Sequence, residues 1–201
     1  DTVKLPVQDS VVAESQDLLP FETISDSLKH SAGQFRIMYY GDSQIEGDRI
    51  TSFLRQSLRN NRGGTGPGLF LPLMPVMYSK SVFIRSSSNW KRYNYLSYKN
   101  REIENSDLGP FMTLCRYLPP GTRSVERVKA SVRVVPSLYA DSSVAVYNNL
   151  RIFYKNTEDI ISVIVSDGNK PLFKDTIGKG GCIREMKIKL NGSKDIRLEF
   201  E

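Results

Sequence analysis

The sequence predicts a mixed fold, in which a short α/β segment is followed by an antiparallel β-sandwich. A mostly apolar run over 35–40, a glycine turn and an amphipathic stretch indicate the first part. Beyond about residue 76 the apolar residues recur with a period of two, which is typical of half-buried strands. Hydrophobic residues make up 39% and charged residues 25% of 201 positions, which argues against a disordered or membrane-spanning chain.

Residues 1–20 are polar and predict an extended arm, and residues 21–74 predict the α/β segment. A short helix is expected from Phe21, and the run 35–40, apolar on both faces, favours a parallel strand buried between helices. The spacing of the apolar residues between Ile45 and Leu58 approximates one face of a helix, with a glycine stop after it.

Residues 75–201 predict the β-sandwich. Alternating runs surround Val128–Val134, Val144–Val146, Ile161–Val165, Ile188–Leu190 and Ile196–Phe200. We expect Asn191–Gly192 to be the turn of a hairpin, because Asn-Gly between alternating strands is the strongest short hairpin signal. Asn148–Asn149 is expected to precede a further strand.

The distribution of charge along the sequence limits the kinds of partner that the protein can bind. Residues 1–74 hold 7 Lys and Arg against 9 Asp and Glu, whereas the remainder holds 21 against 13. The basic second part can attract anionic glycans, phosphates or nucleic acid, but spread charges also suit a solvated surface. No nucleic-acid motif is present, so we predict no nucleic-acid partner. The glycine loop 63–68 lacks a Gly-Lys-Ser/Thr ending, so we predict no nucleotide cofactor.

Metal and disulfide chemistry have little support in the sequence. Neither Cys-x-x-Cys nor His-x-x-x-His spacing occurs, and the aspartates Asp141, Asp159 and Asp167 show no calcium-ligand spacing. We therefore expect no metal. Cys115 and Cys182 either pair or remain two free thiols, and spacing alone leaves both open.

Gly41-Asp42-Ser43 lies where the expected strand turns into the expected helix. A serine there presents its hydroxyl at the carboxyl edge of a sheet, and its N–H can donate to a developing oxyanion. The simpler interpretation is an N-cap on an ordinary helix.

The run from Arg36 to Arg49, RIMYYGDSQIEGDR, resembles the first sequence block of SGNH (GDSL-type) hydrolases. Its last four residues, Glu46-Gly47-Asp48-Arg49, extend that block in a way that is similar to secreted SGNH esterases that act on carbohydrate and peptidoglycan. Peptidoglycan O-acetylesterases of this superfamily carry a carbohydrate-binding-like β-sandwich after the serine block. The resemblance implies a flavodoxin-like α/β hydrolase domain, an ester substrate on carbohydrate or peptidoglycan, no cofactor, and a secreted or periplasmic location.

By this resemblance Ser43 is the nucleophile and a backbone oxyanion donor, and Asp42 supports the turn. The family's base and acid come from a D-x-x-H block after the serine, whereas the single histidine here, His30, precedes it. We therefore expect a fragment that is inactive alone. The rest of the catalytic domain would lie beyond Glu201 or on another chain.

The predicted sandwich offers two roles for its aromatic residues. Trp90, Tyr93 and Tyr95 form either a platform on which sugars stack or part of the core packing. A non-catalytic glycan-binding or adhesion protein is the alternative to the esterase, with the serine block as a structural remnant.

Overall fold

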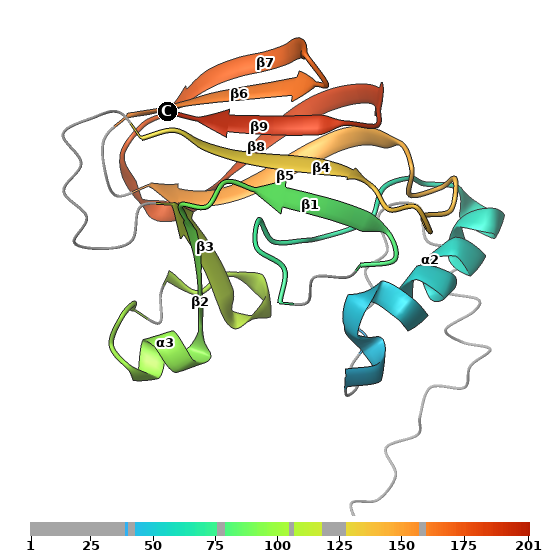
Figure 1. Ribbon diagram of the computed structural model, residues 1–201, viewed down its shortest axis with the longest axis horizontal. Helices are drawn as coiled ribbons and strands as arrows, with labels where there is room; N and C mark the ends of the chain where they lie inside the picture. Colours follow the sequence, from blue (N-terminus) through green and yellow to red (C-terminus); the bar gives the residue numbers. More distant parts are fainter. Residues whose placement is uncertain (1–38, 40–42, 76–78, 105–106, 118–127, 157–159) are drawn as a thin grey trace, which may run out of the picture. The chain divides into compact units, whose positions relative to one another are not determined.

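A computed structural model describes residues 39, 43–75, 79–104, 107–117, 128–156 and 160–201 (Figure 1). The chain divides into two compact units, Asp1–Tyr39 and Tyr40–Glu201. The predicted arm, first helix and strand 35–40 lie outside the described residues, apart from Tyr39, which has no regular secondary structure. Asp42 and His30 also lie outside them. All elements below belong to the second unit.

The helix predicted from Ile45 begins later, and a short helix precedes it. The 3-10 helix η1 spans Ser43–Asp48 and the α-helix α2 spans Arg49–Arg62. Gly47 and Asp48 have φ of 70° and 63°, a left-handed conformation that interrupts a right-handed helix. The predicted end is confirmed, since the N–H of Gly63 donates to the Arg59 carbonyl at 2.7 Å.

The remaining described elements are mainly strands, and every strand pair is antiparallel. A five-stranded sheet has the order β1-β4-β9-β6-β7, and two further sheets pair β2 with β3 and β5 with β8. The strands are β1 Val82–Ser86, β2 Trp90–Asn94, β3 Thr113–Tyr117, β4 Ala130–Pro136, β5 Tyr147–Asn156, β6 Ile161–Asp167, β7 Lys170–Ile177, β8 Gly180–Ser193 and β9 Ile196–Phe200. The short helices α3, Tyr95–Lys99, and η3, Pro110–Met112, lie between β2 and β3. The expected antiparallel, β-rich region is confirmed.

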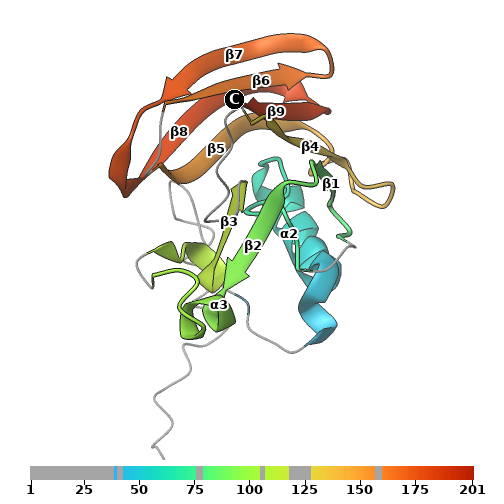
Figure 2. The same cartoon turned by 60° about the vertical axis from the view of Figure 1, so that its left-hand side comes forward.

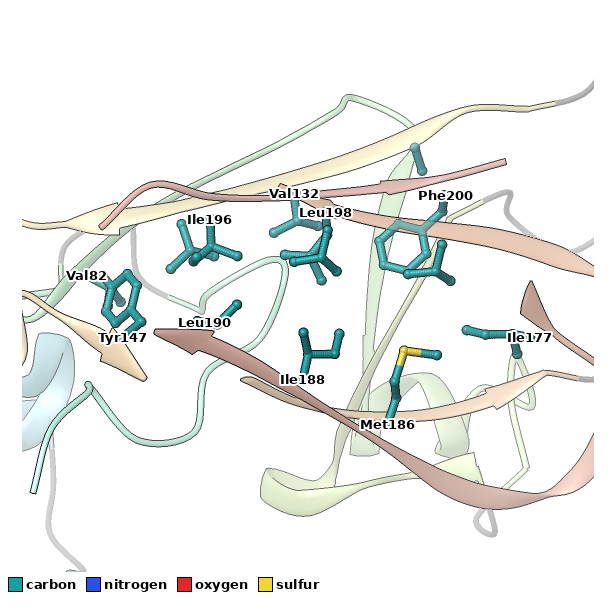
Figure 3. Close-up of a cluster of buried hydrophobic side chains, with 14 residues drawn as sticks. Val82, Val132, Tyr147, Ile177, Met186, Ile188, Leu190, Ile196, Leu198 and Phe200 are labelled. Atoms are coloured by element: carbon teal, nitrogen blue, oxygen red, sulfur yellow. The ribbon is translucent and has the colours of Figure 1, made fainter. Parts of the chain in front are cut away.

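One hydrophobic core joins the five-stranded sheet to the β5–β8 sheet (Figures 2 and 3). Met186, Ile188 and Leu190 of β8 point toward Ile196 and Leu198 of β9 (Figure 3). Lys187 and Lys189 between them are exposed, as the two-residue period predicts. Each fully buried side chain of this size contributes about 1.5–3 kcal/mol to folding.

The predicted Asn191–Gly192 hairpin is wrong. β8 pairs with β5, whereas β9 pairs with β4 and β6, so the two strands belong to different sheets. Asn191 and Gly192 lie inside β8 with φ of 51° and 88°, where the register slips between the pairs Tyr147–Ser193 and Asn149–Lys189. Two adjacent residues with positive φ suit a bulge as well as a tight turn, which explains why the local signal misleads.

The start of β5 also differs from the prediction. Asn148 and Asn149 lie within the strand, which begins at Tyr147. Val144 is buried in the turn before it, where its N–H and that of Ala145 donate to the Asp141 carbonyl at 3.1 Å. The apolar alternation at Val144 therefore reflects a buried turn instead of a strand.

Candidate functional site

Ser43 is exposed at the start of η1, in a turn held by Arg49. The Arg49 guanidinium donates from Nη2 to the Ser43 carbonyl at 2.9 Å and from Nε to the Glu46 carbonyl at 3.1 Å. One side chain thus binds two carbonyl groups of the turn that carries the serine. Arg49 therefore holds the backbone of the turn that contains Ser43.

Asp48 anchors the other end of this turn. Its carboxylate accepts two hydrogen bonds from Arg55, at 2.9 and 3.2 Å from Nη1 and Nη2, and the hydroxyls of Thr51 and Ser81 also donate to it. Ser81 is buried beside the start of β1. The Lys80 N–H donates to the Gly47 carbonyl at 2.8 Å. The end of the Ser43 block is therefore tied directly to the β-rich region.

The environment of Asp48 favours its anion. Burial raises the pKa of this carboxyl, but the hydrogen bonds from Arg55, Ser81 and Thr51 outweigh burial and hold the pKa below its ordinary value. Asp48 is consequently a carboxylate at neutral pH, with its oxygens occupied by donors. Its role in this geometry is to hold the turn.

The position of Ser43 relative to the helix differs from the prediction. The sequence pattern places Ser43 at the N-terminus of the amphipathic helix, whereas α2 begins six residues later, at Arg49. The favourable field of a helix falls off within its first turn. The macrodipole of α2 therefore does not support an oxyanion at Ser43, because the two left-handed residues, Gly47 and Asp48, separate them.

The described residues contain no histidine, since the single histidine of the chain is His30. Within the same residues, no group of three or more His, Cys, Asp or Glu side chains is arranged to hold a metal ion. Ser43 thus has no imidazole base in the described part of the chain.

The glycine loop after α2 is held by side-chain hydrogen bonds. Arg59 donates to the carbonyls of Thr65, Gly66 and Ser143, and the Gly66 N–H donates to the Ser143 carbonyl at 2.9 Å. Asn148 Nδ2 donates to the Thr65 hydroxyl at 3.0 Å. No local pattern in the sequence indicates the contact of Arg59 with Ser143, because the two residues are 84 positions apart.

An open pocket of about 210 Å³ lies beside the Asp48 cluster. It is formed by α2, the residues before β1 and the turn before β5, and its lining is mainly polar: Ser52, Gln56, Lys80, Ser81, Tyr139, Ala140 and Asp141. Ser43 is not among these residues. The pocket therefore does not present a substrate to the serine hydroxyl.

The three predicted stacking residues do not share one exposed face. Trp90 is half-buried, with its ring centroid 5.3 Å from Tyr117 and 5.7 Å from Phe200, and its Nε1 donates to the Ser131 carbonyl. Tyr93 is 1% exposed, so no face of its ring is open to a sugar. Tyr95 is 47% exposed on α3. Of the two predicted roles, core packing is therefore the one that fits Trp90 and Tyr93.

The two cysteines are free thiols in the structure. Cys115 is half-buried in β3 and Cys182 is exposed in β8. Burial raises the pKa of the Cys115 thiol, which disfavours the reactive thiolate.

Comparison of the chain with protein-family models, with curated proteins and with solved structures found no match. In the part of the chain that the structure describes, none of the helices is long and apolar enough to span a membrane.

Proposed function

We propose that the chain is part of an SGNH-type serine esterase that hydrolyses O-acyl esters, chiefly O-acetyl esters, on carbohydrate or peptidoglycan. The observation that carries the proposal is the block from Arg36 to Arg49 with Ser43 at its centre. The exposed position of Ser43 and the anchoring of its turn by Arg49 and Asp48 support it. A secreted or periplasmic location belongs to the same proposal.

In the proposed reaction the Ser43 hydroxyl attacks the ester carbonyl, and a base takes its proton. The tetrahedral intermediate collapses to an acyl-serine as the protonated base returns the proton to the leaving sugar oxygen. Water, deprotonated by the same base, then hydrolyses the acyl-enzyme and regenerates the serine hydroxyl. The base and its orienting acid would come from another part of the catalytic domain, because no histidine follows Ser43 in the sequence. Asp42 would support the turn without taking the proton.

The test is acetate release from O-acetylated peptidoglycan and acetylated xylan by the natural gene product. Ser43→Ala should lower kcat/KM at least about 1000-fold, since it removes the nucleophile. Ser57→Ala is the matched control, because Ser57 is an exposed serine on the neighbouring helix α2. Its activity should equal that of the unmodified protein.

Equal acetate release by the Ser43→Ala and Ser57→Ala proteins would contradict the proposal. So would the absence of acetate release from both substrates by the unmodified protein. With unchanged glycan binding, either result would favour a non-catalytic glycan-binding or adhesion protein.

A further inference from the structure

The outer face of the five-stranded sheet carries a row of three arginines. Arg85 of β1 lies directly opposite Arg133 of β4, and Arg133 lies directly opposite Arg197 of β9. Residues opposed in this way have Cβ atoms about 5 Å apart and project from the same face. Their neighbours along β4 and β9, Val132 and Leu198, point into the core, so the row lies on the side away from it.

The contacts of these arginines leave positive charge on this face. Arg133 donates to the two carboxylate oxygens of Asp195, from Nε at 2.7 Å and from Nη2 at 2.6 Å. Arg197 also acts on Asp195, and together the two arginines hold the pKa of that carboxyl below its ordinary value, chiefly through the Arg133 hydrogen bond. The Arg85 guanidinium lies 5.9 Å from the ring centroid of Phe83. Asp195 is thus one carboxylate that interacts with two of the three arginines in the row, Arg133 and Arg197.

The surrounding charges do not cancel this surplus. In the next row of the same face, Glu199 of β9 lies opposite Ile164 of β6, which in turn lies opposite Lys174 of β7. These two rows therefore carry four cationic side chains and two carboxylates. Just beyond the ends of β4 and β9, the side chains of Lys129 and Glu201 pair with each other at 3.6 Å and add no net charge. Like charges that lie directly opposite each other destabilise a sheet, and a bound anion would relieve that repulsion.

The shape and the side chains of this outer face limit the kind of anionic ligand that it can bind. It is the surface of a sheet with an aromatic ring beside the arginine row, since Phe83 is 49% exposed. An acidic polysaccharide fits this arrangement, because its carboxylates are separated along the chain and its sugar rings have apolar faces that stack on aromatic rings. Nucleic acid fits less well, because its closely spaced phosphates would meet Asp195 and Glu199.

We propose that the outer face of the five-stranded sheet binds an acidic polysaccharide, with Arg85 and Arg197 as donors to its carboxylates and Phe83 as a stacking surface. Asp195 holds the guanidinium of Arg133 between them. The site is independent of Ser43, so the Ser43→Ala protein should bind with unchanged affinity. The proposed esterase and this binding site can therefore fail separately.

The experiment measures the affinity of the full chain for polygalacturonate at low and moderate ionic strength. The double variant Arg85→Gln/Arg197→Gln should bind at least about tenfold more weakly, because it loses two charge-assisted donors. Lys187→Gln/Lys189→Gln is the matched control, since it removes two exposed charges from the outer face of β8. The control should change the affinity by less than about twofold, through long-range attraction alone.

A stability measurement separates loss of binding from loss of folding, and a third variant tests the stacking surface. The arginine double variant should unfold at the same or a higher temperature than the unmodified chain, because it relieves repulsion on an exposed face. Phe83→Ala should weaken polygalacturonate binding and leave the salt dependence unchanged.

Equal losses of affinity in the arginine and lysine double variants would overturn the proposal, because net charge alone would then explain binding. Tighter binding of an oligodeoxythymidine than of polygalacturonate would also overturn it, as would equal binding of neutral dextran.

Discussion

Asp48 is the residue on which the geometry of the Ser43 turn depends most. It adopts a left-handed conformation and accepts hydrogen bonds from Thr51, Arg55 and Ser81. Its side chain is 15% exposed and that of Arg55 is 23% exposed. The ion pair is therefore neither fully buried nor fully exposed to solvent. The partner Ser81 is 33 residues away, and no local pattern in the sequence indicates this contact.

Asp48→Asn should reduce the free energy of unfolding by about 2 kcal/mol at pH 7, which is intermediate between buried and exposed ion pairs. Asparagine keeps the size of the side chain and tolerates left-handed φ, so the variant removes the charge. The measurement is urea unfolding. Asp175→Asn is the control, because Asp175 is exposed on β7 and should change stability by less than about 0.5 kcal/mol.

The difference in stability between the unmodified protein and the Asp48→Asn variant should also depend on pH. The pKa of Asp48 is lower in the folded than in the unfolded chain, so its contribution is present above the unfolded value of about 3.9 and is lost as pH falls through the folded value. The stability difference between the unmodified protein and Asp48→Asn should therefore shrink below about pH 4. A difference that stays constant down to pH 2.5 would show that charge is not the cause.

At the scale of elements, the bulge in β8 allows the strand to leave the β5–β8 sheet before β9 begins in another. The Ser193 hydroxyl donates to the Leu190 carbonyl at 2.6 Å across the bulge. The Asn191–Gly192 pair indicates residues that tolerate left-handed φ, but the hairpin predicted from it is wrong. The sequence does not predict strand pairing, because pairing depends on contacts between β8 and the distant β5.

Gly192→Ala should destabilise the fold by about 1–2 kcal/mol, since φ at this position is 88° and a Cβ atom is unfavourable there. Gly181→Ala in the same strand is the matched control, because a Cβ atom there has no neighbour within 4 Å and its φ lies outside the left-handed region. Thermal unfolding of both variants checks the prediction. Equal midpoints would show that the bulge does not require glycine.

Helix α2 shows where an amphipathic pattern succeeds and where it does not. The pattern predicts the helix and its end at Gly63, but Phe53 and Leu54 of its apolar side are 64% and 37% exposed. Apolar spacing identifies the side of a helix that suits burial, whereas the covering element is set by the rest of the structure.

At the scale of the whole molecule, the two-residue period predicts the core best. Val132, Val163, Ile188 and Leu198 are buried, as the alternation predicts, because one face of each strand must leave water. The three-arginine row follows from the register of β1, β4 and β9, which the sequence alone does not give.

Leu198→Ala should lower the free energy of unfolding by about 3 kcal/mol, because Leu198 is 6% exposed at the centre of the core. Leu138→Ala is the matched control, since Leu138 is 99% exposed and its loss removes no packing. Urea unfolding of the two variants should differ by most of that amount. Similar midpoints would show that the two sheets do not share one cooperative core.

The most direct test of the central claim, that Ser43 is the nucleophile of an esterase, is covalent labelling of the natural gene product with a fluorophosphonate. This probe reacts with activated serine hydroxyls, and peptide mass spectrometry locates the adduct. We predict one phosphonylated peptide that contains Ser43, together with loss of acetate release in proportion to labelling. Acetate release that persists with Ser43 unlabelled, or an adduct on a different serine that abolishes it, would contradict the claim.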